Sequence, residues 1–174
     1  MRKLLFNSII RVPLTEPAPP ADDSLLAELA ASVERNARRR LGRSLAIREV
    51  DAGSCNGCEL EIHALNNAFY DLERFGIRFV ASPRHADVLL VTGPVTKNMR
   101  TALERTYAAT PDPKWVLAVG NCAIDGGVFA GSYAVDGGVS NVLPVDLRIP
   151  GCPPRPEQLL RGLLALLQTS ARSK

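Results

Sequence analysis

The clearest structural signal in this chain is the apolar run Val88-Leu89-Leu90-Val91. Consecutive apolar residues, in place of an alternation with polar ones, are typical of a short strand that is covered on both faces of a parallel sheet. Further candidate strands lie on both sides of this run in the sequence. They span Leu45–Val50, Ile77–Ala81, Trp115–Val119 and Val145–Ile149. We therefore expect a sheet built from these segments together with a strand Val88–Thr92 that contains the apolar run.

Segments with helical character lie between and after these strands. The candidates are Cys58–Phe75, Lys97–Ala109 and Pro156–Gln168. Strands that alternate with helices predict an open, mostly parallel α/β sheet, in which right-handed crossovers place helices on both faces. The expected fold class is therefore α/β.

The first 44 residues differ in character from the rest. Residues 1–21 end in Pro17-Ala18-Pro19-Pro20, which forms neither a helix nor a central strand, so an extended arm is expected there. A helical pattern opens at Ser24 and ends in a strongly basic stretch. Its arginines are Arg35, Arg38, Arg39, Arg40 and Arg43. We expect two parts, residues 1–44 as the arm and basic helix, and residues 45–174 as the α/β domain.

The basic end of that helix has two interpretations. It is a solvated face that complements the helix dipole, or it is a surface that docks on an acidic partner or on anionic lipid headgroups. We expect the arm and the helix to dock on neighbouring subunits.

Composition limits the classes of function. The chain has 174 residues, a net charge of +3 and only 5% aromatic residues, which argues against a nucleic-acid surface of clustered basic and aromatic side chains. No apolar run approaches the ~20 residues that span a bilayer. The start, MRKLLFNSII, is interrupted by Asn7 and Ser8 and lacks the cleavage site of a signal peptide. We expect a cytosolic, unprocessed chain, in which four cysteines indicate metal or redox chemistry.

The four cysteines follow predicted strands. Cys55 and Cys58 form a C-x-x-C pair after the strand that starts at Leu45, and Cys122 and Cys152 each follow a later strand. The carboxyl ends of parallel strands lie side by side at one edge of an open α/β sheet, where ligands bind. We therefore expect the four thiols to converge, although they are distant in sequence.

Three kinds of chemistry fit four such cysteines. Four thiolates hold either a 4Fe–4S cluster or a tetrahedral zinc ion, but structural zinc sites usually draw their ligands in two close pairs. Here only one pair is close. A thioredoxin-like redox dithiol at Cys55 and Cys58 is the third possibility, and it leaves Cys122 and Cys152 unexplained. Glycines beside each ligand allow the backbone to approach a cluster closely.

The motifs around these cysteines resemble those of a known family. They are Cys55-Asn56-Gly57-Cys58-Glu59-Leu60-Glu61, then Gly120-Asn121-Cys122-Ala123 leading to Gly126-Gly127, then Pro150-Gly151-Cys152-Pro153-Pro154-Arg155-Pro156-Glu157. The chain resembles the 20 kDa-type iron–sulfur subunit, a family that respiratory complex I shares with the small subunits of membrane-bound nickel–iron hydrogenases. The likeness covers roughly Ile47 to Leu167.

The resemblance implies a flavodoxin-like fold and one 4Fe–4S cluster with Cys55, Cys58, Cys122 and Cys152 as ligands. It implies a non-catalytic electron-transfer subunit of an oxidoreductase, which faces a large catalytic subunit and has other iron–sulfur and membrane subunits as neighbours. The chain would then lie peripherally on the cytoplasmic side of the cell membrane. The C-x-x-C spacing is closer to subunits of the formate hydrogenlyase type. The alternative is the corresponding subunit of a complex I-like NADH:quinone oxidoreductase, which passes electrons to quinone at a shared interface.

Other polar residues near these motifs have two interpretations each. Glu59 and Glu61 are acids favoured in a first helical turn, or carboxylates of a proton relay or interface. His63 is expected to be a partly buried polar contact and His85 an exposed residue. Arg155 is a plain surface arginine, or it stabilises the cluster's charge or pairs with a partner's carboxylate. The glycine-rich stretch after Gly126 lacks a P-loop lysine, which argues against nucleotide binding there.

Overall fold

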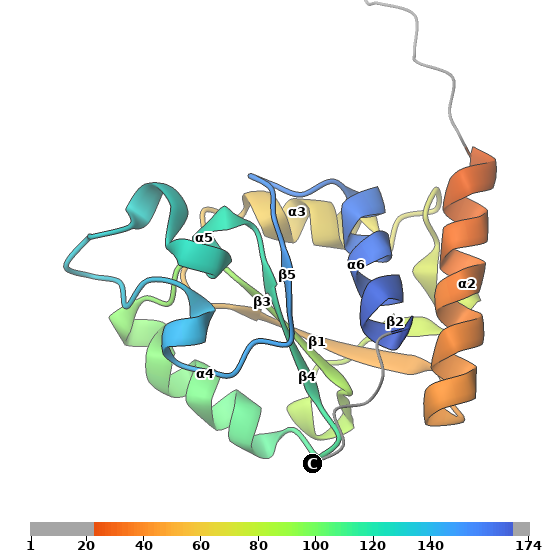
Figure 1. The fold of residues 1–174 in the computed structure, drawn as a ribbon, viewed down its shortest axis with the longest axis horizontal. Coiled ribbons are helices and arrows are strands. Elements are labelled where there is room, and N and C mark those ends of the chain that lie inside the picture. Colours follow the sequence, from red (N-terminus) through yellow and green to blue (C-terminus); the bar gives the residue numbers. More distant parts are fainter. Residues whose placement is uncertain (1–22, 169–174) are drawn as a thin grey trace, which may run out of the picture.

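The structure is a computed structural model that describes residues 23–168. Its centre is one sheet of five strands in the order β2-β1-β3-β4-β5, and every pair of neighbours is parallel (Figure 1). The strands are β1 (Leu45–Asp51), β2 (Ile77–Phe79), β3 (Val88–Thr92), β4 (Trp115–Val119) and β5 (Leu147–Ile149). The predicted open, mostly parallel α/β fold is confirmed, and the sheet is parallel throughout.

The strand order has a consequence for ligand binding. An order of 2-1-3-4-5 is the flavodoxin-like arrangement, in which the chain reverses direction across the sheet between β1 and β3. At that switch point the loops after the two strands diverge to opposite faces and leave a crevice at the carboxyl edge. The segment that carries Cys55 and Cys58 follows β1, so it lies at this crevice.

Helices cover both faces of the sheet (Figure 1). Helices α2 (Asp23–Leu41), α3 (Gly57–Ala64) and α6 (Pro156–Gln168) contribute to one apolar core, together with Leu45 and Ile47 of β1. Helices α4 (Lys97–Ala109) and α5 (Asn121–Asp125) contribute to the other core, with Leu89 and Val91 of β3. Strand β3 is buried along its whole length because both faces are covered.

Four single-turn 3₁₀ helices complete the described elements. They are η1 (Leu72–Phe75), η2 (Pro83–His85), η3 (Gly127–Phe129) and η4 (Val139–Asn141). The last two lie in the glycine-rich stretch between α5 and β5. Among residues 23–168, no helix combines the length and the apolar character that a membrane span requires.

The predicted helix Cys58–Phe75 is wrong beyond its first two turns. Helix α3 ends at Ala64, and the chain continues through turns before η1 starts at Leu72. The side chain of Asn67 causes this break, because its Oδ1 accepts the N–H groups of Phe69 (2.9 Å) and Tyr70 (3.0 Å). An Asn side chain that binds backbone two and three residues ahead stabilises a turn in competition with a helix.

The basic helix is packed onto its own chain. Ala30, Val33 and Ala37 of α2 are buried in the same core as α6 and β1. Two of its arginines have partners in the chain: Arg38 pairs with Glu34 at 2.9 Å, and Arg35 donates to the Ser32 hydroxyl. The predicted arm, residues 1–21, lies outside the described residues. Docking of the outer face of α2 on a neighbouring subunit stays a prediction.

Candidate functional site

The loop after β1 carries the first cysteine pair. The Asp51 carboxylate oxygen Oδ1 accepts the N–H groups of Gly53 and Ser54, each at 2.7 Å, and the Ser54 hydroxyl accepts the N–H of Asn56 at 3.0 Å. Asn56 has a left-handed backbone (φ 71°) and precedes the first residue of α3. These contacts turn the chain sharply, so that Cys55 lies in the loop and Cys58 in the first turn of the helix.

Close packing holds this loop against the segment that follows β3. A Cβ atom added to Gly93, just after β3, would lie 2.6 Å from the Ser54 backbone nitrogen. A Cβ atom added to Gly53 would lie 2.2 Å from a side-chain carbon of Thr96. Side chains at either glycine would push the two loops apart. The cysteine pair is therefore fixed at the β1/β3 switch point.

The third and fourth cysteines follow the next two strands of the sheet. Cys122 is the second residue of α5, directly after β4, and Cys152 follows β5. Strands β4 and β5 are neighbours, and the Gly120 N–H donates to the Ile149 carbonyl at 2.8 Å beyond the last strand pair. Cys122 and Cys152 line one shallow hollow of about 380 Å³, together with Val128 and Gly127 of η3.

Cys58 of the first pair also lies at the end of β4. A Cβ atom added to Gly120 at the end of β4 would lie 2.6 Å from the Cys58 sulfur, so the Cys58 side chain rests against that strand end. Burial raises the pKa of Cys58 to about 12, with further increments from the negative charges of Glu59, Cys122, Cys55 and Cys152. Cys58 therefore lies beside the strand end that leads to Cys122.

The Cys122 thiol has similar surroundings. Burial raises its pKa first, and the neighbouring Cys152 and Cys55 raise it further, while a hydrogen bond from the Val128 backbone N–H opposes the shift. Cys58 and Cys122 are half-buried, and Cys55 and Cys152 are exposed. The predicted convergence of the four cysteines at one edge of the sheet is therefore what the structure shows.

The spacing of these thiols bears on the kind of metal site. Two thiolates on one zinc ion lie about 3.8 Å apart, because each Zn–S bond is about 2.3 Å in tetrahedral geometry. Within residues 23–168, no three side chains of the His, Cys, Asp and Glu types are placed to hold a single metal ion.

Glu59, which follows the cysteine pair, is buried, and Glu49 of β1 is partly buried. Glu59 is only 6% exposed, and neither of its carboxylate oxygens has a hydrogen-bond partner in the described chain. Burial raises the pKa of Glu49 in β1; the nearby His63 lowers it, and Glu59 and Asp51 raise it. The predicted first-turn position of Glu59 in α3 is correct, but its burial was not predictable from the sequence, because it depends on how α3 packs in the folded chain.

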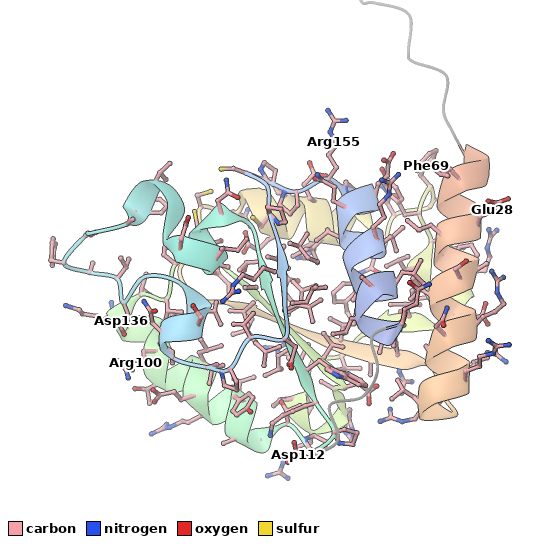
Figure 2. The ribbon with its side chains drawn as sticks, viewed as in Figure 1. Glu28, Phe69, Arg100, Asp112, Asp136 and Arg155 are labelled. Atoms are coloured by element: carbon pink, nitrogen blue, oxygen red, sulfur yellow. The ribbon has the colours of Figure 1, made fainter. Side chains whose placement is uncertain are left out.

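The two histidines and Arg155 face solvent. The His63 side chain is 73% exposed, with its Nε2 3.9 Å from the Glu49 carboxylate, so the expectation of partial burial is wrong. His85 is exposed as expected. Figure 2 shows Arg155 projecting away from the fold, at the end of the molecule opposite to Asp112. Arg155 is thus available to a partner and is not folded back over the chain.

Exposed apolar side chains occur in the segments that carry the cysteines. Val128 is 81% exposed and Tyr133 is 89% exposed, both in the glycine-rich stretch after Cys122, and Leu60 in the cysteine-pair helix is 64% exposed. We call these three residues the apolar rim. Of the three, Val128 lines the hollow that contains Cys122 and Cys152.

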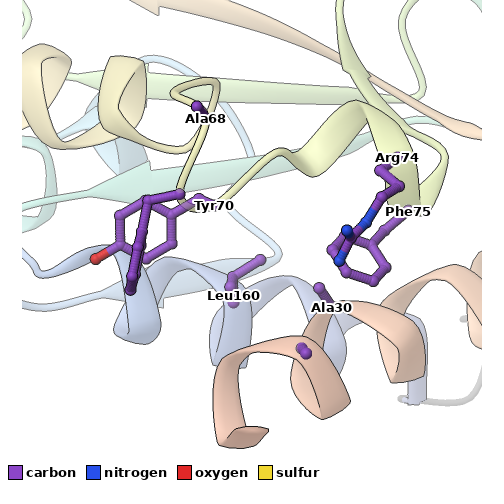
Figure 3. Close-up of a pocket in the computed structure, with 8 residues that line it drawn as sticks. Ala30, Ala68, Tyr70, Arg74, Phe75 and Leu160 are labelled. Carbon is purple, nitrogen blue, oxygen red and sulfur yellow. The ribbon is translucent and has the colours of Figure 1, made fainter. Parts of the chain in front are cut away.

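A second hollow lies away from the cysteines. It has a volume of about 360 Å³ and lies between α2, α6 and the segment that ends in η1 (Figure 3). Tyr70, Arg74, Phe75 and Leu160 line it, and the guanidinium carbon of Arg74 lies 4.8 Å from the centre of the Phe75 ring. It contains no cysteine and no nucleophile, so its lining gives no indication of chemistry.

The chain has clear similarity to known proteins. Residues 55–166 match the family described as "NADH ubiquinone oxidoreductase, 20 Kd subunit". The chain is 48% identical over 132 residues to the probable membrane-bound hydrogenase subunit mbhJ of Pyrococcus furiosus, across 76% of this chain and 79% of that protein. It is 44% identical over 151 residues to formate hydrogenlyase subunit 7 of Escherichia coli, across 87% of this chain and 58% of that protein.

Two further similarities point in the same direction. The chain is 50% identical over 117 residues to an NADH-quinone oxidoreductase subunit of Citrifermentans bemidjiense, across 67% of this chain and 68% of that protein. Among solved structures, a chain of the membrane-bound sulfane sulfur reductase MBS, an archaeal respiratory membrane complex, matches with a TM-score of 0.65 and 40% identity. That match covers 78% of this chain and 74% of the other.

Proposed function

This chain belongs to the NADH ubiquinone oxidoreductase 20 kDa subunit family, and from that premise we propose that it is the electron-transfer subunit of a membrane-associated oxidoreductase complex. In this proposal Cys55, Cys58, Cys122 and Cys152 hold one 4Fe–4S cluster. The large catalytic subunit covers the cysteine edge, and the chain is held peripherally at the cytoplasmic side of the membrane through partner subunits. This chain itself makes and breaks no substrate bond.

The observation that carries the proposal is the meeting of four thiols from three strand ends at one edge of the sheet. The donor set fits a cluster, since Cys₄ ligation is usual for 4Fe–4S centres. Only Cys55 and Cys58 form a close pair, and the other two cysteines come singly from later strand ends, which differs from the two close pairs usual in structural zinc sites. The same observation gives less support to a structural zinc module.

The residues of this chain have definite tasks toward such a cluster. When bound, a 4Fe–4S cluster supplies one-electron chemistry. The chain contributes four thiolates, a backbone N–H from Val128 to the Cys122 sulfur, and half-burial of Cys58 and Cys122. Hydrogen bonds to sulfur and burial are the means by which a protein sets the reduction potential of a cluster.

The branch within the family follows from motif spacing and similarity together. The C-x-x-C pair at Cys55 and Cys58 differs from the adjacent cysteines usual in complex I subunits. Relatives named as hydrogenase and formate hydrogenlyase subunits align over more of this chain than the NADH-quinone oxidoreductase relative does. We therefore propose a complex of the hydrogenase or formate hydrogenlyase type. A complex I-like protein that delivers electrons to quinone is the second candidate, favoured by the 50% identity to that relative.

The exposed side of the site supports a protein partner. Cys55 and Cys152 are exposed, and the apolar rim adds accessible apolar surface in the segments beside them. A cluster held by exposed thiols reacts readily with oxygen and chelators, so a covering subunit would protect it. The same contact would bring the cluster close to the partner's own redox centre.

Anaerobic purification tests the proposal. The chain, isolated with its partner subunits or reconstituted with iron and sulfide, is expected to be brown and to contain about four irons and four sulfides per chain. Cys152→Ser and Cys122→Ser are each expected to lower the iron content strongly. A colourless chain with one zinc would overturn the cluster in favour of a zinc module. Full C-x-x-C dithiol activity in Cys152→Ser without iron would overturn it in favour of a thiol oxidoreductase.

A further inference from the structure

The loops of Cys122 and Cys152 are joined by a pair of hydrogen bonds that involve one side chain. The Asn121 backbone N–H donates to the Gly151 carbonyl at 2.8 Å. In return, the Gly151 N–H donates to the side-chain oxygen Oδ1 of Asn121 at 3.0 Å. Each of the two bonded residues immediately precedes a cysteine, so this pair of contacts, the Asn121–Gly151 bracket, spans the two proposed ligand loops.

The bracket continues the sheet where the sheet itself has ended. The last strand pair joins Val119 and Ile149, and the Gly120 N–H still donates to the Ile149 carbonyl. After Gly120 the chain turns into α5, so the backbone carbonyls on that side are engaged in the helix. The amide oxygen of Asn121 takes the place of the missing backbone acceptor for the Gly151 N–H.

The surroundings leave Gly151 little freedom to compensate. Its backbone lies at φ 147°, and a Cβ atom there would meet the Cα of Pro154 at 2.5 Å. The loop that carries Cys152 is therefore tightly folded on one side and held by Asn121 on the other. Removing the Asn121 side chain would free the Gly151 N–H and allow Cys152 to move relative to Cys122.

We propose that Asn121 is a positioning residue, which fixes the separation of Cys122 and Cys152 for the cluster by accepting the Gly151 N–H. This inference rests on the proposed function, because it concerns the same four ligands. The role follows from the hydrogen bond between the Gly151 N–H and the Asn121 side chain, and not merely from the position of Asn121 before Cys122 in the sequence. The role requires a side-chain oxygen at residue 121 that accepts the Gly151 N–H. An aspartate supplies this oxygen and an alanine does not.

The test compares Asn121→Ala, Asn121→Asp and a control, Asn98→Ala, in the full chain with its partner subunits. Asn98 lies exposed on α4, on the face of the sheet that also carries α5, and outside the cysteine loops. Asn121→Ala is expected to release iron to a chelator about five times faster, the effect of losing one hydrogen bond. Asn121→Asp is expected to keep the wild-type release rate and to show a more negative cluster potential, because it adds a negative charge beside the ligands. Asn98→Ala is expected to match wild type in both.

A second measurement uses the metal-free full chain. Amide hydrogen exchange at Gly151 is expected to be faster in Asn121→Ala and protected in Asn121→Asp. Iron release equal to wild type in Asn121→Ala, or no recovery in Asn121→Asp, would overturn the positioning role. A wild-type chain that takes up no cluster would overturn the proposed function, whatever the hydrogen exchange at Gly151 shows. A wild-type chain that takes up a full cluster, together with an Asn121→Ala variant that retains its cluster equally well, would overturn only the role of Asn121.

Discussion

Gly120 has a left-handed backbone (φ 85°) and lies directly against the Cys58 sulfur. At this residue the absence of a side chain is what brings the loop after β1 to the end of β4. The positions of the four cysteines after strands were predictable, because both the cysteine motifs and the strands are recognisable from the sequence. The roles of Gly120 and Asn121 were not, because they depend on which loops meet across the sheet.

Gly120→Ala is expected to lose most of its iron. The new Cβ would lie 2.6 Å from the Cys58 sulfur, and the backbone strain would add about 1–3 kcal/mol. Gly131→Ala is the matched control, since Gly131 has a similar φ of 79° with nothing within 4 Å of the added atom. Iron analysis and thermal unfolding of both variants measure the difference. Equal iron contents in the two variants would contradict the steric argument.

Glu49→Gln is expected to stabilise the chain at pH 7. Burial raises the pKa of Glu49 in the folded state above its ordinary value of 4.5. The neutral carboxyl is therefore favoured by folding: its contribution to the free energy of unfolding is fully present below pH 4.5 and is lost as the pH rises through the folded-state pKa. Glutamine stays neutral, so the variant should show a Tm higher by about 2 °C at pH 7 and no difference at pH 4. The exposed Glu28→Gln serves as control. A gain that persists unchanged at pH 4 would exclude this explanation.

Elements of the fold were predictable where periodicity was long or burial complete. Strands β3 and β4 and helices α4 and α6 have the bounds expected from the sequence. The helix expected from Cys58 to Phe75 breaks after Ala64, because a single Asn67 side chain competes with helical hydrogen bonds. Helix α5 was not predicted, since five residues are too few to show a helical period.

Asp87 connects the end of α2 to the sheet. Its carboxylate, 4% exposed, accepts from the Arg43 guanidinium at 2.6 Å and from the Ala46 N–H at 2.9 Å. Asp87→Ala would leave the buried Ala46 N–H without its acceptor, so we expect a loss of about 2–4 kcal/mol in the free energy of unfolding. Asp112→Ala is the control, since that carboxylate is 85% exposed. Denaturant unfolding measures both, and equal stabilities would refute the role of Asp87.

Helix α2 is expected to be part of the folded unit. Val33 is fully buried against the core that α6 and β1 share, so Val33→Ala should cost about 1–3 kcal/mol. Arg35→Ala on the exposed face should change stability by less than about 0.5 kcal/mol. Calorimetry on the full chain checks this. A Val33→Ala variant as stable as wild type would mean that α2 is an appendage rather than a part of the core.

At the scale of the whole molecule, the carboxyl edge of the sheet is a surface suited to a partner. The cysteines lie at the carboxyl edge of the sheet, and the apolar rim belongs to the segments around them. Composition alone indicated a globular domain without a nucleic-acid surface, but it carried no information on which surface would face a partner. That information required the fold, because the exposed Val128 and Tyr133 lie in a glycine-rich stretch without periodicity.

Tyr133→Ala is expected to weaken assembly with the large subunit by about tenfold, because a truncated interface aromatic commonly removes about 1–2 kcal/mol of binding. The iron content of the chain, reconstituted alone, should be unchanged. Phe69→Ala is the matched control, an exposed aromatic (57%) outside the apolar rim. Co-purification and a titration of the two subunits provide the measurement. A Phe69 variant that weakens assembly as much as the Tyr133 variant would remove the argument for the rim.

The wide separation of the cysteines along the chain has a consequence for biogenesis. Cys55 and Cys152 stand near opposite ends of the α/β domain. Synthesis must therefore proceed past residue 152 before all four sulfurs are available. In the proposed function, insertion of the cluster would therefore follow the synthesis of β5 and its pairing with β4.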